Sequence, residues 1–238
     1  MPREFGTDFD NLKQFIASYS LESIKDDPSF TLILSQQHKK YYSYLTYVGE
    51  LQNIVENPDF TPIISRNQIT FFRESCSDVG ISLFSLVHGS YKASKVMLRS
   101  SIETFFKGFF YDEIPHIDQI TSVFELFRTI KALPFYLISS NKAVIDDIHQ
   151  HYKTLCSDVH TSSIINMSNI SAMNYFPTFD LKEASIVNVV NLALVPDYLY
   201  LLGIKYNIHF HQIHFKNKAI IKCSIPKNLR PYLNNILT

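Results

Sequence analysis

Apolar residues in this chain recur at the three-, four- and seven-residue spacings that place side chains on one face of a helix. Phe9, Leu12 and Ile16 follow this spacing near the N-terminus. The 238 residues include only 6 glycines, and few Asn-Gly or Asp-Gly pairs occur, which disfavours a fold with many tight hairpins. The sequence therefore predicts an all-α fold, a compact bundle of about six or seven helices.

Capping residues and prolines set the expected helix boundaries. Asp27 can cap a helix in which Pro28 is the first residue, and Asn67 can cap the next one. Gly89 marks either a helix end or a close contact between two helices. The expected helices cover residues 9–19, 28–57, 67–87, 91–111, 119–133, 141–159 and 181–206.

The two ends of the chain are expected to differ from this central bundle. No internal repeat or linker is visible, so we expect one domain over residues 1–238, with an N-terminal arm of about residues 1–26 and a C-terminal tail of about residues 207–238. Within the tail, residues 209–225 alternate apolar and polar positions loosely, which predicts a short strand or an extended arm. Residues 161–177 are rich in Ser and Asn and predict a loop.

Charge and cysteine content narrow the classes of function. The 22 basic and 22 acidic residues cancel, so any contact with a nucleic acid has to be local. Three widely spaced cysteines provide neither a disulfide framework nor a CxxC motif, and residues 1–10 lack the apolar run of a signal peptide. We therefore expect a cytoplasmic protein. These cysteines are Cys76, Cys156 and Cys223.

Residues 185–206 form the stretch that comes nearest to a membrane span. A span needs about 18 uninterrupted apolar residues, and polar residues and a proline interrupt this one. We expect a buried central helix here and no membrane partner. The interrupting residues are Asn188, Asn191, Pro196 and Asp197.

Arg99 and Glu103 are two charged residues, four positions apart, within the otherwise apolar or small segment LRSSIETFF. At this spacing they share one face of a helix. The surrounding apolar residues suggest an enclosed helix, in which a guanidinium needs partners because an unpaired buried charge is unfavourable. Tyr152, Cys156 and His160 are the best candidates, since they fall on one helical stripe and His160, at the helix C-terminus, can ionise near neutral pH.

The pairing of an LRSxxE segment, which contains Arg99 and Glu103, with a later YxxLxxxVH segment, which runs from Tyr152 to His160, resembles bacterial helical proteins related to the HEPN superfamily. Some of these proteins belong to abortive-infection and other phage-defence systems. The resemblance covers residues 85–162. It implies a helical bundle that forms a homo-oligomer, with RNA as a target or with a protein partner in a defence complex.

Active HEPN ribonucleases carry an arginine and a histidine on one helix, as Arg-x(4–6)-His, and dimerisation brings two such motifs together to cut RNA without a metal. None of the nine histidines here follows an arginine at that spacing, so only a split pair remains, Arg99 and His160. In such a pair His160 serves as general base or acid on a ribose 2′-hydroxyl, and Arg99 stabilises the phosphorane charge. Glu103 orients Arg99, and Tyr152 completes the set.

The same four residues also fit a purely structural role. Arg99, Glu103, Tyr152 and His160 can form a buried network in which every polar group is paired and which fixes the register of the helices. The protein would then be a non-enzymatic binding or scaffold subunit. We keep both interpretations open, and neither requires a cofactor or a metal.

Other residue clusters carry weaker signals. His209, His211 and His214 could offer imidazoles to a metal, but no nearby cysteine or carboxylate completes a ligand set. His149 and His151 are expected on a solvent-facing side of their helix. Basic and aromatic residues interleave in the tail and suit either a nucleic-acid strand or a solvated edge. The Walker, GxGxxG, HExxH and GxSxG motifs are absent.

Overall fold

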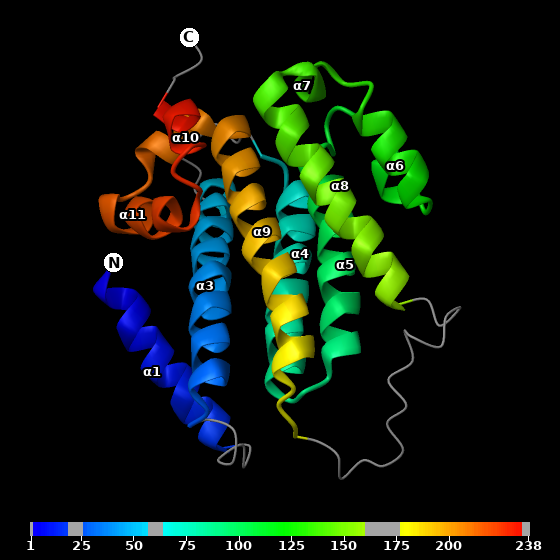
Figure 1. The fold of residues 1–238 in the computed structure, drawn as a ribbon. Helices are drawn as coiled ribbons and strands as arrows, with labels where there is room; N and C mark the ends of the chain where they lie inside the picture. Colours follow the sequence, from blue (N-terminus) through cyan, green and yellow to red (C-terminus); the bar gives the residue numbers. More distant parts are fainter. Residues whose placement is uncertain (1, 19–25, 57–63, 160–176, 235–238) are drawn as a thin grey trace.

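The computed structural model describes residues 2–18, 26–56, 64–159 and 177–234, and the regular structure of these residues is entirely helical (Figure 1). Ten α-helices, eight of them with seven residues or more, form a compact bundle, which confirms the predicted fold class. The helices are α1 (Arg3–Ser18), α3 (Pro28–Glu56), α4 (Arg66–Val87), α5 (Tyr91–Phe109), α6 (Val123–Ile130), α7 (Pro134–Leu137), α8 (Ser139–Val159), α9 (Leu181–Lys205), α10 (Asn207–Gln212) and α11 (Phe215–Ser224), with short 3₁₀ turns at Ile117–Gln119 and at Arg230–Asn234, the latter called η4.

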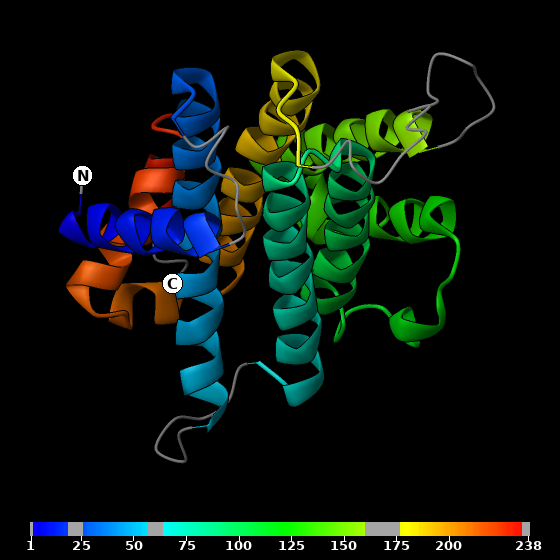
Figure 2. The same cartoon turned by 90° about the horizontal axis from the view of Figure 1, so that it is seen from below.

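The long helices are arranged around α9. Helices α3, α4 and α5 lie side by side in chain order, and α9 packs against both α3 and α5 (Figures 1 and 2). Helix α8 covers α5 and also contacts α9, whereas α1 lies on the outside of α3. Two helices far apart in the sequence, α3 and α9, thus form the centre of the bundle.

Side-chain caps explain where α3 and α4 begin. The Asp27 carboxylate accepts hydrogen bonds from the backbone amides of Ser29 and Phe30, at 2.8 and 2.9 Å, so the predicted cap of α3 is confirmed. The N-cap of α4 lies two residues earlier than expected. Ser65 caps it in a reciprocal capping box with Gln68, so the prediction that Asn67 is the cap is wrong.

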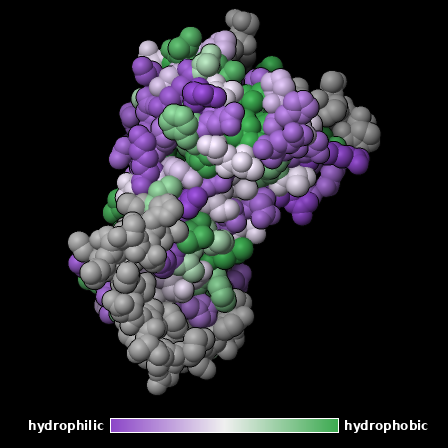
Figure 3. Space-filling view, turned by 90° about the vertical axis from the view of Figure 1, so that its right-hand side faces the viewer, coloured by the Kyte–Doolittle hydropathy of each residue, from purple (hydrophilic) through white to green (hydrophobic). Residues whose placement is uncertain are grey.

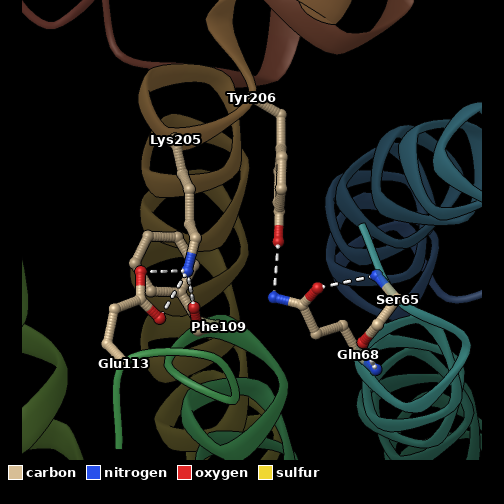
Figure 4. Close-up of polar contacts among 6 residues, drawn as sticks. All are labelled: Ser65, Gln68, Phe109, Glu113, Lys205 and Tyr206. Carbon is tan, nitrogen blue, oxygen red and sulfur yellow. Dashed lines mark hydrogen bonds and ion pairs between the residues drawn. The ribbon is translucent and has the colours of Figure 1, made fainter. Parts of the chain in front are cut away.

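Polar contacts fix the C-terminal end of α9 against two other helices (Figure 4). The Lys205 ammonium donates hydrogen bonds to the Phe109 carbonyl at the end of α5 and to the Glu113 carboxylate, with the Lys205 Nζ–Glu113 Oε1 distance at 2.7 Å. The Gln68 side-chain amide donates to the Tyr206 hydroxyl at 3.3 Å. These contacts connect the C-terminal end of α9 to α4 and to the end of α5.

Helix α9 is apolar on all sides and is the one described helix long and apolar enough to cross a membrane by length and composition. In the bundle, 78% of its most apolar stretch is buried. The helix runs through Pro196 without interruption. The expected buried central helix is therefore what this segment forms in the fold.

The C-terminal tail is helical, so the predicted strand or extended arm over residues 209–225 is wrong. Helices α10 and α11 occupy this segment, and α11 packs against α3. Ile220, Ile221 and Ser224 are buried, and the Ser224 hydroxyl lies 2.7 Å from the Ser43 hydroxyl of α3. Packing against α3 selects a helix where the local apolar pattern was ambiguous.

Gly89 marks a helix end, as one of the two predictions had it, whereas its close contact is with the chain before α9 and not with a second helix. It ends the turn between α4 and α5 with a φ of +77°, a conformation that L side chains rarely adopt. It also lies so close to the chain before α9 that an added Cβ would be 2.4 Å from the Thr178 carbonyl oxygen. The glycine therefore permits both the turn and the close approach.

Candidate functional site

Helices α5 and α8 bring together three of the four residues singled out in the sequence. Arg99 donates a hydrogen bond through Nε to the Tyr152 hydroxyl at 3.1 Å, and that hydroxyl donates to Glu103 Oε1 at 3.0 Å. Arg99 Nε also lies 3.5 Å from Glu103 Oε1, and the guanidinium carbon is 5.5 Å from the centre of the Tyr152 ring. We call these three residues the Arg99 cluster.

His160, the fourth residue, lies outside the described residues. Helix α8 ends at Val159, directly before it. The predicted loop over residues 161–177 also falls almost wholly outside them. The role assigned to His160 and its pairing with Arg99 therefore stay predictions.

The Arg99 cluster is partly open to solvent. The side chains of Arg99 and Glu103 are each 30% exposed, whereas Tyr152 is only 8% exposed. The prediction of an enclosed helix holds for most of α5, whose apolar side chains are buried, but Arg99 lies at its edge. The cluster combines a buried phenol with a cation and a carboxylate that solvent reaches.

Burial and the neighbouring groups shift the pKa values of Tyr152 and Arg99. Burial and the Glu103 charge raise the pKa of Tyr152 well above its ordinary value, despite the opposing effect of Arg99. Burial disfavours the charge of Arg99, but the hydrogen bond to Tyr152 and the Glu103 charge outweigh it and raise the pKa of Arg99. At neutral pH the phenol is a hydrogen-bond donor and the guanidinium is a cation.

Cys156 lies one turn after Tyr152 on α8, and its thiol adds to the high pKa of the phenol. The thiol is half-buried and unbonded to other cysteines. It thus adjoins the Arg99 cluster, as the helical stripe in the sequence predicted.

Figure 3 shows the side of the molecule that lies to the right in Figure 1, where α6 and α8 are. Hydrophilic side chains predominate over its upper part, and smaller hydrophobic areas lie between them. Phe124 of α6 and Leu137 of α7 are 78% and 70% exposed. This face is therefore mixed in hydropathy, with hydrophobic areas among hydrophilic ones.

The histidines behave differently from the sequence expectation. His149 is only partly exposed, and its ring stacks on that of Phe127 with 4.0 Å between the ring centres. His209 is buried and lies 3.1 Å from Gln212, and His211 contacts the carbonyl oxygen of Leu233 at 2.9 Å. Within the described part of the chain, no group of three His, Cys, Asp or Glu side chains is placed to hold a metal.

Sequence reasoning missed a pair of carboxyl groups, Asp147 of α8 and Asp197 of α9. Asp197 is 8% exposed, and burial together with the charge of Asp147 raises its pKa to about 8. The sequence did single out Asp197, since this residue interrupts the apolar helix α9. Its partner was not recognisable, because fifty positions and a change of helix separate the two residues.

Comparison with protein-family models, with curated proteins and with solved structures gives no match for this chain. The resemblance to HEPN-related proteins therefore stays a prediction that rests on the two short sequence segments.

Proposed function

We propose that this protein is a HEPN-like, defence-associated ribonuclease of the cytoplasm, in which Arg99 binds the scissile phosphodiester of RNA. The observation that carries the proposal is that the Arg99 guanidinium is held by its Nε atom. Both of its hydrogen-bond and ion-pair contacts use Nε, and within the described residues neither terminal nitrogen has an acceptor. A guanidinium presented in this way suits bidentate contact with a phosphate.

The remaining residues of the site have distinct roles in this proposal. Glu103 and Tyr152 are positioning residues that hold Arg99 in one orientation, which reduces the entropy lost on binding. His160 removes the proton of a ribose 2′-hydroxyl, and the 2′-oxygen attacks the adjacent phosphorus. The protonated His160 returns the proton to the departing 5′-oxygen, and the products are a 2′,3′-cyclic phosphate and a free 5′-hydroxyl. Arg99 stabilises the charge that develops on the phosphorane.

The nucleophile in this reaction belongs to the substrate, so no metal-activated water is required. The resemblance further implies that two copies associate, which would bring two Arg99–His160 pairs to one RNA. The net charge of zero agrees with local recognition at this site and not with a general affinity for nucleic acid.

A cleavage assay with matched variants tests the proposal. Purified protein is incubated with labelled single-stranded RNA in the presence of EDTA, alongside Arg99→Ala, His160→Ala and the control Arg128→Ala. Arg128 is an exposed arginine of α6 that pairs with Glu125 across 3.8 Å. We expect cleavage by the wild type and the control, loss of at least about a hundredfold in the other two, and no cleavage of a 2′-deoxy substrate.

Cleavage that survives in His160→Ala, or that proceeds on the 2′-deoxy substrate, would contradict the mechanism. Each variant is first checked for cooperative thermal unfolding, so that loss of activity is not confused with loss of the fold. Growth arrest on expression, present for the wild type and absent for Arg99→Ala, would connect the activity to abortive infection.

One observation favours a second candidate, a non-enzymatic scaffold subunit. Arg99 Nε, the Tyr152 hydroxyl and Glu103 Oε1 are already paired with one another, and Tyr152 is almost fully buried. Such internal pairing is typical of a network that fixes helix register. A wild-type protein that leaves RNA intact, with Arg99→Ala and Glu103→Gln both strongly destabilised, would favour the scaffold.

A further inference from the structure

A cavity of about 420 Å³ opens between α8, α9 and the C-terminal turn that leads into η4. Its volume falls within the range of small-molecule sites, about 300–1,000 Å³. Ser140 and Asp147 line it from α8, Asp197 from α9, and Asn228 and Tyr232 from the C-terminal turn and η4. Three separate parts of the chain thus contribute polar groups to one concave surface.

Asp197 is the unusual residue of this cavity. Its side chain is more than nine-tenths buried, and its Oδ2 atom has no hydrogen-bond donor in the part of the chain that the structure describes. It follows Pro196 in the most apolar helix of the protein, where a carboxylate is unfavourable unless a cation or a proton compensates it. Asp197 thus lines the cavity and carries a buried oxygen atom that no donor in the described residues satisfies.

The group that faces Asp197 from α8 is a second carboxyl, Asp147. The two are within hydrogen-bonding range of one another, although both are acceptors when ionised. His151 Nε2 lies 3.5 Å from the Asp147 Oδ2 atom, and the Asp147 side chain is 56% exposed. The two carboxyl groups, one of them protonated at neutral pH, thus face each other where the cavity meets α8 and α9.

We propose that this cavity binds a small aliphatic amine, whose ammonium group donates hydrogen bonds to Asp197 and Asp147. An ammonium is a compact charge with three donors, which suits two carboxyl groups from different helices better than the planar fork of a guanidinium. The Tyr232 ring, 47% exposed at the rim, offers an aromatic face to the cation or its alkyl chain. This site is separate from the Arg99 cluster and does not depend on the proposed ribonuclease activity.

The cavity is less suited to a metal ion. Hard divalent cations take about six oxygen ligands, and in the described ranges no third His, Cys, Asp or Glu side chain joins this pair in an arrangement that could hold one. A diamine such as putrescine satisfies both carboxyl groups at one end and extends past Tyr232 at the other. Putrescine is therefore the probe of choice.

Isothermal titration calorimetry of the full chain with putrescine at pH 7 tests the proposal. We expect saturable binding to the wild type, affinity at least about tenfold lower for Asp197→Asn and for Asp147→Asn, and affinity within about twofold of wild type for Asp118→Asn. Asp118 is an exposed aspartate outside the cavity, so this control removes the same charge. Agmatine and Mg²⁺ serve as competing probes.

Binding of the amine should also release a proton. Because burial and Asp147 raise the pKa of Asp197 to about 8, the free site holds a proton at pH 7 that the ammonium displaces. The measured heat should therefore differ between phosphate and Tris buffers by their ionisation enthalpies, and this difference should vanish in Asp197→Asn.

Three outcomes would overturn the proposal: no saturable binding of putrescine by the wild type, equal affinity in all three variants, or binding of Mg²⁺ that putrescine does not displace. Misfolding does not obscure the result. Asparagine replaces a buried carboxyl with a neutral group of the same shape, so Asp197→Asn should unfold at or above the wild-type temperature, which a thermal scan verifies.

Discussion

The Tyr152 hydroxyl lies 3.1 Å from Arg99 Nε, and this contact joins α8 to α5 at the edge of the core. The same hydroxyl donates to Glu103, so one oxygen atom connects the cation and the carboxylate of the cluster. Removal of that single atom leaves the ring packing intact. Removing the Tyr152 hydroxyl is therefore the most selective way to disturb the cluster.

Tyr152→Phe should lower the free energy of unfolding by about 1 kcal/mol, because the buried hydroxyl makes two hydrogen bonds that the variant lacks. Urea denaturation measures the change. Tyr111→Phe is the control, since the hydroxyl of Tyr111 accepts a hydrogen bond from Asn67 at an exposed position. An effect of Tyr111→Phe as large as that of Tyr152→Phe would contradict the bridging role.

Asp197→Asn should change how stability depends on pH. The pKa of Asp197 is raised from 3.8 to about 8, so the folded state holds a proton that the unfolded state has lost between these values. Wild-type stability should therefore fall as the pH rises from about 4 to 8, and the variant should lack this contribution. Denaturation midpoints at several pH values measure it, and parallel curves for the two proteins would refute the assignment.

His149→Phe should make the protein more resistant to acid. Burial and the nearby Lys131 and Lys153 lower the pKa of His149 from 6.5 to about 4, so the folded state favours the neutral ring. Its stabilising contribution is complete above pH 6.5 and is lost as the pH falls toward 4. Phenylalanine keeps the stacking on Phe127 without the titration.

Thermal unfolding between pH 7 and pH 4 measures this effect. His116→Asn removes an exposed imidazole, and asparagine accepts the φ of 55° found at that position. This control should keep the acid sensitivity of the wild type. Equal sensitivity of His149→Phe and the wild type would show that the His149 ring is not held neutral by the fold.

Gly89→Ala and Gly49→Ala should have opposite effects on stability. At Gly89 an alanine meets a positive φ and the Thr178 carbonyl, so the variant should lose about 2 kcal/mol or more. At Gly49, inside α3, an added Cβ has nothing within 4 Å, and alanine should add about 0.5–1 kcal/mol through its helix propensity. Chemical denaturation of both variants checks the pair of signs.

Side-chain patterns within a few positions of one another were enough to predict one helix cap and one core helix. The cap at Asp27 and the core helix over residues 91–111 follow from side-chain chemistry within a few positions, and both agree with the structure to within two residues. The cap of α4 differed, because Ser65 and Gln68 form a capping box that outcompetes Asn67. The sequence contained this signal two residues upstream of the expected cap.

Long-range packing explains what local rules did not predict. Residues 209–225 have an ambiguous apolar pattern, and their helices depend on burial against α3, which lies more than 150 positions earlier. The contact of Arg99 with Tyr152 was predictable, since a partly buried arginine needs partners and the later stripe supplied one. The Asp147–Asp197 pair was not predictable, because neither residue by itself indicates which other helix its side chain will meet.

The position of α9 in the chain has a consequence for synthesis. Helices α3 and α5 both pack against α9, which is synthesised after both of them. Until then their core-facing side chains stay accessible to other molecules, including chaperones. Nascent chains that end before residue 181 should therefore be protease-sensitive, and protection should arise abruptly once the residues of α9 have cleared the exit tunnel.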